Sequence, residues 1–200
     1  MPKSLLTFAP VELQKALFVQ EGKLIQQNGA EQKINHIKEN IKAIEVKKSI
    51  KIAAHNINGL KGNRHKLEIL VDKFEEEEYD MIGILEMNIL EKEGHFIIRH
   101  RENIDSFWTD AEKGKSKSSG VGIIISQKWS KHIGQVRKHS GYLLEVYFFF
   151  KQFELVIFIV YIAPNSQLKR KEVQRIIMKE IAQRKSNTYF IIIGNFNHII

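Results

Sequence analysis

The longest uninterrupted apolar run in the chain, the nine residues 155–163, sets the first constraint on what the chain can fold into. A helix needs about 20 consecutive apolar residues to cross a bilayer, so this run is too short for a membrane span. Its length and its content of β-branched residues are typical of a buried strand. We therefore expect a fold built around a buried sheet, with no membrane partner.

The composition is that of one globular domain, or of a domain with a short appendage. Of the 200 residues, 43% are hydrophobic and 27% are charged, which is enough apolar material for a core and unlike a disordered tail. The absence of cysteine excludes disulfides, thiolate zinc sites and cysteine nucleophiles. The first residues do not form the long apolar stretch of a secretory signal. We expect an intracellular protein, nuclear or cytoplasmic, that is not secreted.

Basic residues outnumber acidic ones. The 31 Lys and Arg against 23 Asp and Glu give a formal net charge of +8, which favours polyanionic partners over acidic ones. The basic residues are dispersed, with small clusters such as residues 61–66 and 169–171. Taken alone, such clusters are more often solvated surface than nucleic-acid contacts. The charge is therefore a bias toward nucleic acid and does not define a site.

Residues 1–50 are predicted to form a helical extension. A helix is expected over residues 11–27, ending at an Asn-Gly pair that commonly stops helices. Four isoleucines then follow one another at spacings of three, four and three residues: Ile34, Ile37, Ile41 and Ile44. This is the a/d pattern of a short coiled coil, which would allow an oligomer through residues 34–44. Only two heptads are visible, so an amphipathic helix lying on the domain is an equal alternative.

From residue 51 onward, strand patterns alternate with amphipathic helices, which predicts an α/β domain over residues 51–200. Strands are expected at residues 49–57, 81–85, 121–126, 142–150, 153–162 and 189–193, and helices at residues 67–74 and 171–184. The polar, glycine-containing residues 111–120 are expected to form a surface loop. Lys151 and Gln152 are the expected turn of a hairpin.

Polar side chains stand at the ends of four of these strands. They are Asn56 and Asn58, Glu86, Tyr161, and Asn195 with Asn197. A carboxylate surrounded by amide oxygens suits a hard cation such as Mg²⁺, which prefers oxygen ligands and keeps several waters. Each residue taken singly has an ordinary explanation, such as a turn for Asn58 or the core for Tyr161. The six residues together are the candidate site.

Four motifs in sequence order carry a family resemblance: KIAAHNINGL at residues 51–60, YDMIGILE at 79–86, VYIAPN at 160–165 and IGNFN at 193–197. Together they resemble the endonuclease/exonuclease/phosphatase family, and most closely the endonuclease domains of non-LTR retrotransposons. The resemblance runs from about residue 51 to the last residue. It implies a partial four-layered DNase I-like α/β sandwich, with two packed sheets flanked by helices, following the helical extension.

The resemblance also implies a function, DNA endonuclease activity that depends on Mg²⁺, or on Mn²⁺ in its place. Glu86 would hold the metal, with Asn58 in the same metal site. Asn56 would orient the phosphate and the attacking water, Tyr161 would contact the scissile phosphate, and Asn197 would position the reacting groups. Few protein groups are needed, because one metal ion can neutralise the phosphate and stabilise the leaving oxygen.

Two departures from the family pattern argue against full activity. Asn195 stands where the family has an aspartate, and an amide cannot accept a proton from the attacking water. The family's C-terminal Ser-Asp-His motif would lie beyond residue 200, so we expect a truncated domain. The first hypothesis is therefore an endonuclease whose activity is impaired or lost. The alternative is a catalytically inactive retrotransposon remnant with weak nucleic-acid binding or helix-mediated partner binding.

Overall fold

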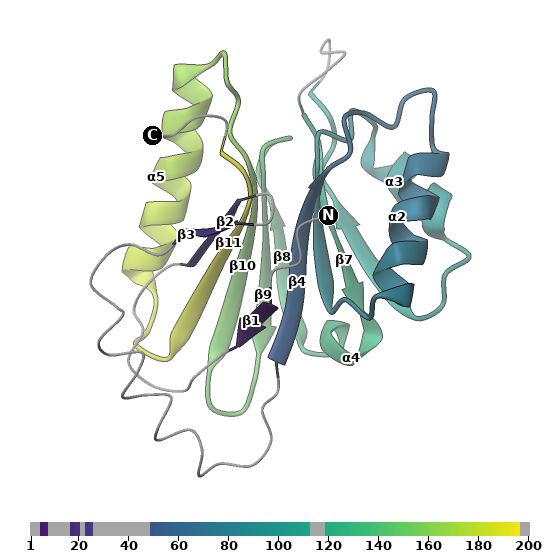
Figure 1. Cartoon of the computed structure of the whole chain (residues 1–200). Coiled ribbons are helices and arrows are strands. Elements are labelled where there is room, and N and C mark those ends of the chain that lie inside the picture. Colours follow the sequence, from purple (N-terminus) through teal and green to yellow (C-terminus); the bar gives the residue numbers. More distant parts are fainter. Residues whose placement is uncertain (1–4, 8–16, 21–22, 26–48, 113–118, 197–200) are drawn as a thin grey trace.

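Two mixed β-sheets pack face to face, and helices cover their outer faces (Figure 1). The computed structural model describes residues 5–7, 17–20, 23–25, 49–112 and 119–196. Helices α2 (His65–Glu76) and α3 (Glu91–Ile98) lie outside one sheet, and α5 (Gln167–Gln183) lies outside the other. The four layers confirm the predicted α/β sandwich.

The first sheet has the strand order β1-β4-β5-β7-β6 within the described residues. Its strands are β1 (Leu5–Thr7), β4 (Ser49–Asn56), β5 (Met81–Leu85), β6 (Ile104–Trp108) and β7 (Val121–Ser126). Strands β4 and β5 are parallel, and β7 is antiparallel to β5. The carboxyl ends of β4 and β5 therefore lie at the same edge of the sheet.

The second sheet has the order β3-β2-β11-β10-β9-β8. Its strands are β2 (Leu17–Gln20), β3 (Lys23–Ile25), β8 (Ile133–Lys138), β9 (Leu143–Phe149), β10 (Glu154–Tyr161) and β11 (Thr188–Asn195). Strands β10 and β11 are parallel, whereas β9 and β10 form an antiparallel hairpin. The apolar run at residues 155–163 thus supplies most of a central strand, as its length predicts.

The main core fills the space between the two sheets. Side chains of β4, β5 and β7 meet those of β9, β10 and β11, and nearly all are fully buried. Gly83 on β5 is needed for this close approach, because a Cβ there would lie 2.7 Å from Cδ1 of Ile193 and 3.4 Å from Cγ2 of Ile159. A smaller core lies between the first sheet and α2, where Leu67, Val71 and Phe74 are buried.

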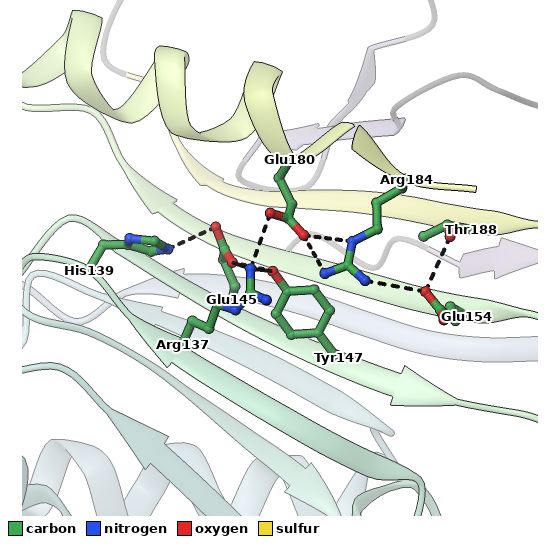
Figure 2. Close-up of polar contacts among 8 residues, drawn as sticks. All are labelled: Arg137, His139, Glu145, Tyr147, Glu154, Glu180, Arg184 and Thr188. Carbon is green, nitrogen blue, oxygen red and sulfur yellow. Dashed lines mark hydrogen bonds and ion pairs between the residues drawn. The ribbon is translucent and has the colours of Figure 1, made fainter. Parts of the chain in front are cut away.

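Helix α5 is held to the second sheet partly by a polar network (Figure 2). Within the helix, Val173 and Ile177 are buried. Near its end, Glu180 accepts hydrogen bonds from Arg184 at 2.6 Å and from Arg137 of β8 at 3.2 Å. Burial raises the pKa of Tyr147, which also donates a hydrogen bond to Glu145 on the same strand.

The network is not the candidate site. Its carboxylate Glu145 is 1% exposed, and Nε2 of His139 lies 2.8 Å from Oε1 of Glu145. Arg137 and Arg184 line a hollow of about 350 Å³ beside α5 together with Glu154, Glu180, Gln183 and Lys185. Because both arginines are paired with carboxylates, the network serves to fix the helix on the sheet.

Most of the predicted elements of residues 51–196 are confirmed. Strands β5 and β7 have the predicted bounds, and β4, β9, β10 and β11 differ from prediction by one or two residues at their ends. Sequence analysis missed α3, α4 (Gln127–Ser130), β6 and β8. These elements are short and half-exposed, so their hydrophobic periodicity is weak.

The prediction of a helix over residues 11–27 is wrong for its described part. Residues 17–20 and 23–25 form strands, and β2 pairs in parallel with β11. The edge of β11 presents backbone N–H and C=O groups that a strand can pair and a helix cannot, since a helix uses its own groups internally. The isoleucine repeat of residues 34–44 lies outside the described residues, and the domain boundary near residue 50 stays a prediction.

In the parts of the chain that the structure describes, no helix is both long and apolar enough to span a membrane.

Candidate active site

Asn56 and Glu86 meet at the carboxyl ends of two parallel strands. Asn56 ends β4 in register with Leu85, the last residue of β5, and Glu86 follows directly. The Nδ2 group of Asn56 donates a hydrogen bond to Oε1 of Glu86 at 2.6 Å. Hydrogen bonds to an ionised acceptor are short and about twice as strong as neutral ones. Two predicted site residues, 30 positions apart in the chain, are thus in direct contact.

Asn58 belongs to the same group. Its backbone N–H donates to Oδ1 of Asn56 at 3.0 Å, so both ends of the Asn56 amide are engaged. This contact fixes which way the amide faces, because Nδ2 must then point to Glu86. Asn58 and Gly59 form the expected turn, with φ of 49° and 77°.

Backbone strain is concentrated around this group. Four described non-glycine residues have positive φ, and three of them lie in the two site loops: Asn58 at 49°, Glu86 at 55° and Asn88 at 55°. The left-handed region is costly for residues with a Cβ, and asparagine tolerates it better than glutamate. Strained residues of this kind cluster where a site needs a fixed geometry. Glu86 is therefore held by its surroundings in a conformation that it would otherwise avoid.

Tyr161 and Asn195 form a second group at the ends of the parallel strands β10 and β11. They are partners in the register of the two strands, and the Ile162 N–H donates to the Asn195 carbonyl at 2.9 Å. The Tyr161 ring is buried and stacks on Tyr142 with ring centroids 6.1 Å apart. At Gly194 an added Cβ would lie 1.8 Å from the Val160 carbonyl oxygen, so that position must be glycine.

Backbone hydrogen bonds connect the two groups. The Met87 N–H donates to the Gly120 carbonyl at 3.1 Å, and the Gly120 N–H donates to the Gly141 carbonyl at 2.8 Å. The next carbonyl, that of Tyr142, accepts from the Tyr161 N–H at 2.9 Å. The loop after Glu86 is thereby tied to the end of β10. Figure 1 shows the ends of β4 and β10 at the same, upper end of the two sheets.

A charged cluster that sequence analysis missed lies against the second group. Lys169 of α5 pairs with Glu112, and its ammonium lies 3.2 Å from the Tyr142 hydroxyl and 4.5 Å from the centre of the Tyr142 ring. Although burial lowers the pKa of Lys169, hydrogen bonds with Glu112 and Tyr142 raise it above its ordinary value. Lys169 therefore stays charged. Sequence analysis noted residues 169–171 only as a basic cluster. The pairing of Lys169 with Glu112 had no sequence signal, because Glu112 is 57 positions away in the chain.

Of the six predicted site residues, Asn56, Asn58 and Glu86 form one group and Tyr161 with Asn195 forms the other. Asn197 lies outside the described residues. Sequence analysis also did not identify Asn88, whose side chain donates a hydrogen bond to the Glu86 carbonyl. Its signal was available, since asparagine soon after a strand is common at positions with positive φ.

The donor set around Glu86 suits a magnesium ion held by one carboxylate. Among the described residues no three His, Cys, Asp or Glu side chains converge as a metal cluster. Magnesium needs only one or two carboxylates and keeps several waters. Glu86 is half-buried, and one oxygen of its carboxylate accepts the hydrogen bond from Asn56. Glu86 is thus the residue that could hold the ion.

Solved structures share the fold. The 3′ phosphatase NExo from Neisseria, solved with a product DNA hairpin, matches with a TM-score of 0.51 and 14% identity over 73% of this chain and 57% of its own. An endonuclease/exonuclease/phosphatase family protein from Leptotrichia buccalis matches with a TM-score of 0.51 and 17% identity over 74% of this chain and 66% of its own. The telomere-specific non-LTR retrotransposon TRAS1 endonuclease domain has a TM-score of 0.46, 14% identity and coverages of 72% and 58%.

The chain therefore has the DNase I-like fold of the endonuclease/exonuclease/phosphatase family. It spans less than two thirds of the length of these structures. No protein-family model matches the sequence, and no curated protein matches it either.

Proposed function

We propose that the chain carries a divalent-metal site for phosphodiester hydrolysis in DNA, with Glu86 as the metal-holding residue. The observation that carries the proposal is the 2.6 Å contact between Asn56 and Glu86, made by a glutamate held at positive φ. The fold supports this chemistry, and the Neisseria enzyme that shares it is a phosphatase solved with product DNA. The net charge of +8 suits a polyanionic substrate.

Each residue has a defined task in this proposal. Glu86 holds Mg²⁺, or Mn²⁺ in its place, with Asn58 beside it. Asn56 keeps the Glu86 carboxylate oriented and helps to orient the phosphate and the attacking water. Tyr161 contacts the scissile phosphate, and Asn197 positions the reacting groups. When bound, the ion neutralises phosphate charge and stabilises the leaving oxygen.

Asn195 limits the rate in this proposal. The β10–β11 register fixes its backbone at the strand end beside Tyr161. An amide there can donate a hydrogen bond to water but cannot take the proton that the attacking water must lose. General base assistance contributes about 10² to 10⁴ in rate. We therefore propose that hydrolysis is impaired.

A second candidate function follows from the same residue. If asparagine at position 195 abolishes hydrolysis completely, the chain is a catalytically inactive remnant that binds nucleic acid weakly through its basic surface. Such binding would weaken steeply with salt, because phosphate contacts release counterions.

Plasmid nicking distinguishes the two candidates. Supercoiled DNA is incubated with the chain and Mg²⁺, with EDTA, and with the Glu86→Gln variant, which keeps the side-chain size but removes the charge. The first proposal expects slow nicking that is lost both in EDTA and in the variant. Nicking that survives Glu86→Gln would contradict it, as would no nicking above a buffer control. Retention of DNA in a gel-shift assay without nicking would support the second candidate.

A further inference from the structure

Asn88 makes three hydrogen bonds that join the loops around Glu86. Its Nδ2 group donates to the Glu86 carbonyl at 3.1 Å, and its Oδ1 accepts from the Ser119 N–H at 3.1 Å. Its own backbone N–H donates to the Ser119 carbonyl at 2.9 Å. The side chain therefore connects the loop that follows β5 with the loop that precedes β7.

The Glu86 carbonyl has a second donor. The Gly59 N–H donates to it at 2.7 Å, so one carbonyl oxygen accepts from both Asn88 and the loop that follows β4. A Cβ at Gly59 would lie 3.3 Å from Nδ2 of Asn88, which shows how closely the loop that follows β4 packs against the loop that follows β5. The orientation of the Glu86 peptide is therefore fixed from two sides.

This arrangement accounts for the backbone conformation of Glu86. A glutamate at φ of 55° is unfavourable by itself and persists only where its surroundings enforce it. Hydrogen bonds to its carbonyl set the orientation of the peptide that follows Glu86, and this peptide and the Glu86 side chain are both attached to the same Cα. A change at this peptide thus changes where the carboxylate lies relative to Asn56.

We infer that Asn88 is a positioning residue that holds Glu86 in its left-handed conformation, so that the Glu86 carboxylate stays within hydrogen-bond distance of Asn56 and is preorganised for a divalent cation. The cation-binding part of this inference rests on the proposed function, whereas the Asn56 contact is independent of it. The competing explanation is that asparagine occupies position 88 only because it tolerates a positive φ.

The Asn88→Gly variant separates these explanations. Glycine adopts positive φ more readily than asparagine. The variant can therefore keep the backbone conformation of position 88 while both side-chain hydrogen bonds are lost. Glu78→Gly is the matched control, because Glu78 also has positive φ, at 53°, but lies at the end of α2 away from the site. Asn88→Asp is a second variant, because it keeps an oxygen for Ser119 but has no N–H for the Glu86 carbonyl.

The first readout is the NMR signal of the Asn56 side-chain amide in the full chain without metal. In the unmodified chain we expect one amide proton shifted downfield and protected from exchange by the bond to Glu86. We expect this signature to be lost in Asn88→Gly and Asn88→Asp and retained in Glu78→Gly. The second readout is Mg²⁺ titration followed by the same signals, where Asn88→Gly should weaken Mg²⁺ binding about tenfold, because the Glu86 carboxylate is no longer preorganised for the ion.

Two results would overturn the inference: an unchanged Asn56 signature in both Asn88 variants, or the same loss of signature in Glu78→Gly. Failure of the proposed function is visible separately. If the unmodified chain does not nick DNA above a buffer control, the proposed hydrolysis fails, while the Asn56 signal still decides whether Asn88 positions Glu86. A change in melting temperature with an unchanged Asn56 signal would support the purely conformational explanation.

Discussion

Tyr161 and Asn195 are register partners at the ends of the parallel strands β10 and β11, and the Asn195 carbonyl accepts the N–H of Ile162 at 2.9 Å. The backbone of Asn195 is thus fixed by the sheet whatever its side chain is. A substitution at this position changes the chemistry of one side chain and leaves its location unchanged. This makes Asn195 a favourable position at which to test the proposed reaction.

Asn195→Asp is expected to increase the rate of Mg²⁺-dependent nicking by about 10² to 10⁴, because a carboxylate can accept a proton from the attacking water. The measurement is the initial rate of plasmid nicking at equal protein concentration. Asn187→Asp, at an exposed position, is the control for added negative charge and should leave the rate unchanged. An equal rate in Asn195→Asp and the unmodified chain would remove Asn195 from the proposed mechanism.

Asn56→Asp is expected to make the stability of the chain depend on Mg²⁺. The substitution replaces the donor that lies 2.6 Å from Oε1 of Glu86 with a second carboxylate. Like charges in contact disfavour each other's ionisation, and we expect a loss of about 1–3 kcal/mol in the free energy of unfolding. A cation between the carboxylates should restore it.

Thermal unfolding with EDTA and with Mg²⁺ measures this effect. Asn63→Asp adds the same charge in an exposed loop position and should show little response to Mg²⁺. Equal melting temperatures for Asn56→Asp in EDTA and in Mg²⁺ would argue against cation binding at this position.

Gly194→Ala is expected to destabilise the second sheet next to the site. Its Cβ would lie 1.8 Å from the Val160 carbonyl oxygen, so the strands would have to separate. We expect a loss of about 3 kcal/mol in the free energy of unfolding, as for overpacking in a core. Urea denaturation measures it. Gly62→Ala is the control, because Gly62 also lacks a side chain at φ of 87° but has open space around it, so it should cost only about 1 kcal/mol.

The polar network beside α5 predicts a pH dependence of stability (Figure 2). Burial raises the pKa of Glu180, but hydrogen bonds from Arg184 and Tyr147 and the nearby charges of Arg184 and Arg137 outweigh burial and lower it below 4.5. A lowered folded-state pKa adds stability that is fully present above the unfolded-state pKa and is lost as the pH falls through the folded-state pKa.

Glu180→Gln should therefore lose about 1–3 kcal/mol of stability at pH 7 relative to the unmodified chain. This difference should shrink as the pH falls below 4.5, the ordinary pKa of the group. Urea denaturation at a series of pH values measures both. Glu76→Gln, at an exposed position of α2, should show neither effect, and a difference for Glu180→Gln that is constant with pH would contradict the assigned role.

Much of the sheet core could be predicted from the sequence. Strands such as Met81–Leu85 and Val121–Ser126 are continuous apolar runs, and burial on both faces leaves a strong local pattern. The contact between Asn56 and Glu86 could also be anticipated, because each follows or ends a strand. Edge elements such as β6 and β8 could not, since half-exposed strands have weak patterns.

The strands at residues 17–20 and 23–25 show a different limit. Local sequence favoured a helix there, and the open edge of β11 supplies the backbone partners that make a strand the better conformation. Such a partner lies more than 150 residues away, so no local window contains it.

By itself, the sequence determined which segments are buried strands and which polar residues stand at their ends, because burial and periodicity are properties of neighbouring residues. Only the tertiary structure decided that Lys169 pairs with Glu112, that Glu86 is held at positive φ, and that the Asn88 side chain accepts a hydrogen bond from the Ser119 N–H. These depend on hydrogen bonds and ion pairs between loops far apart in the chain. Such contacts exist only after the sheets have brought the loops together.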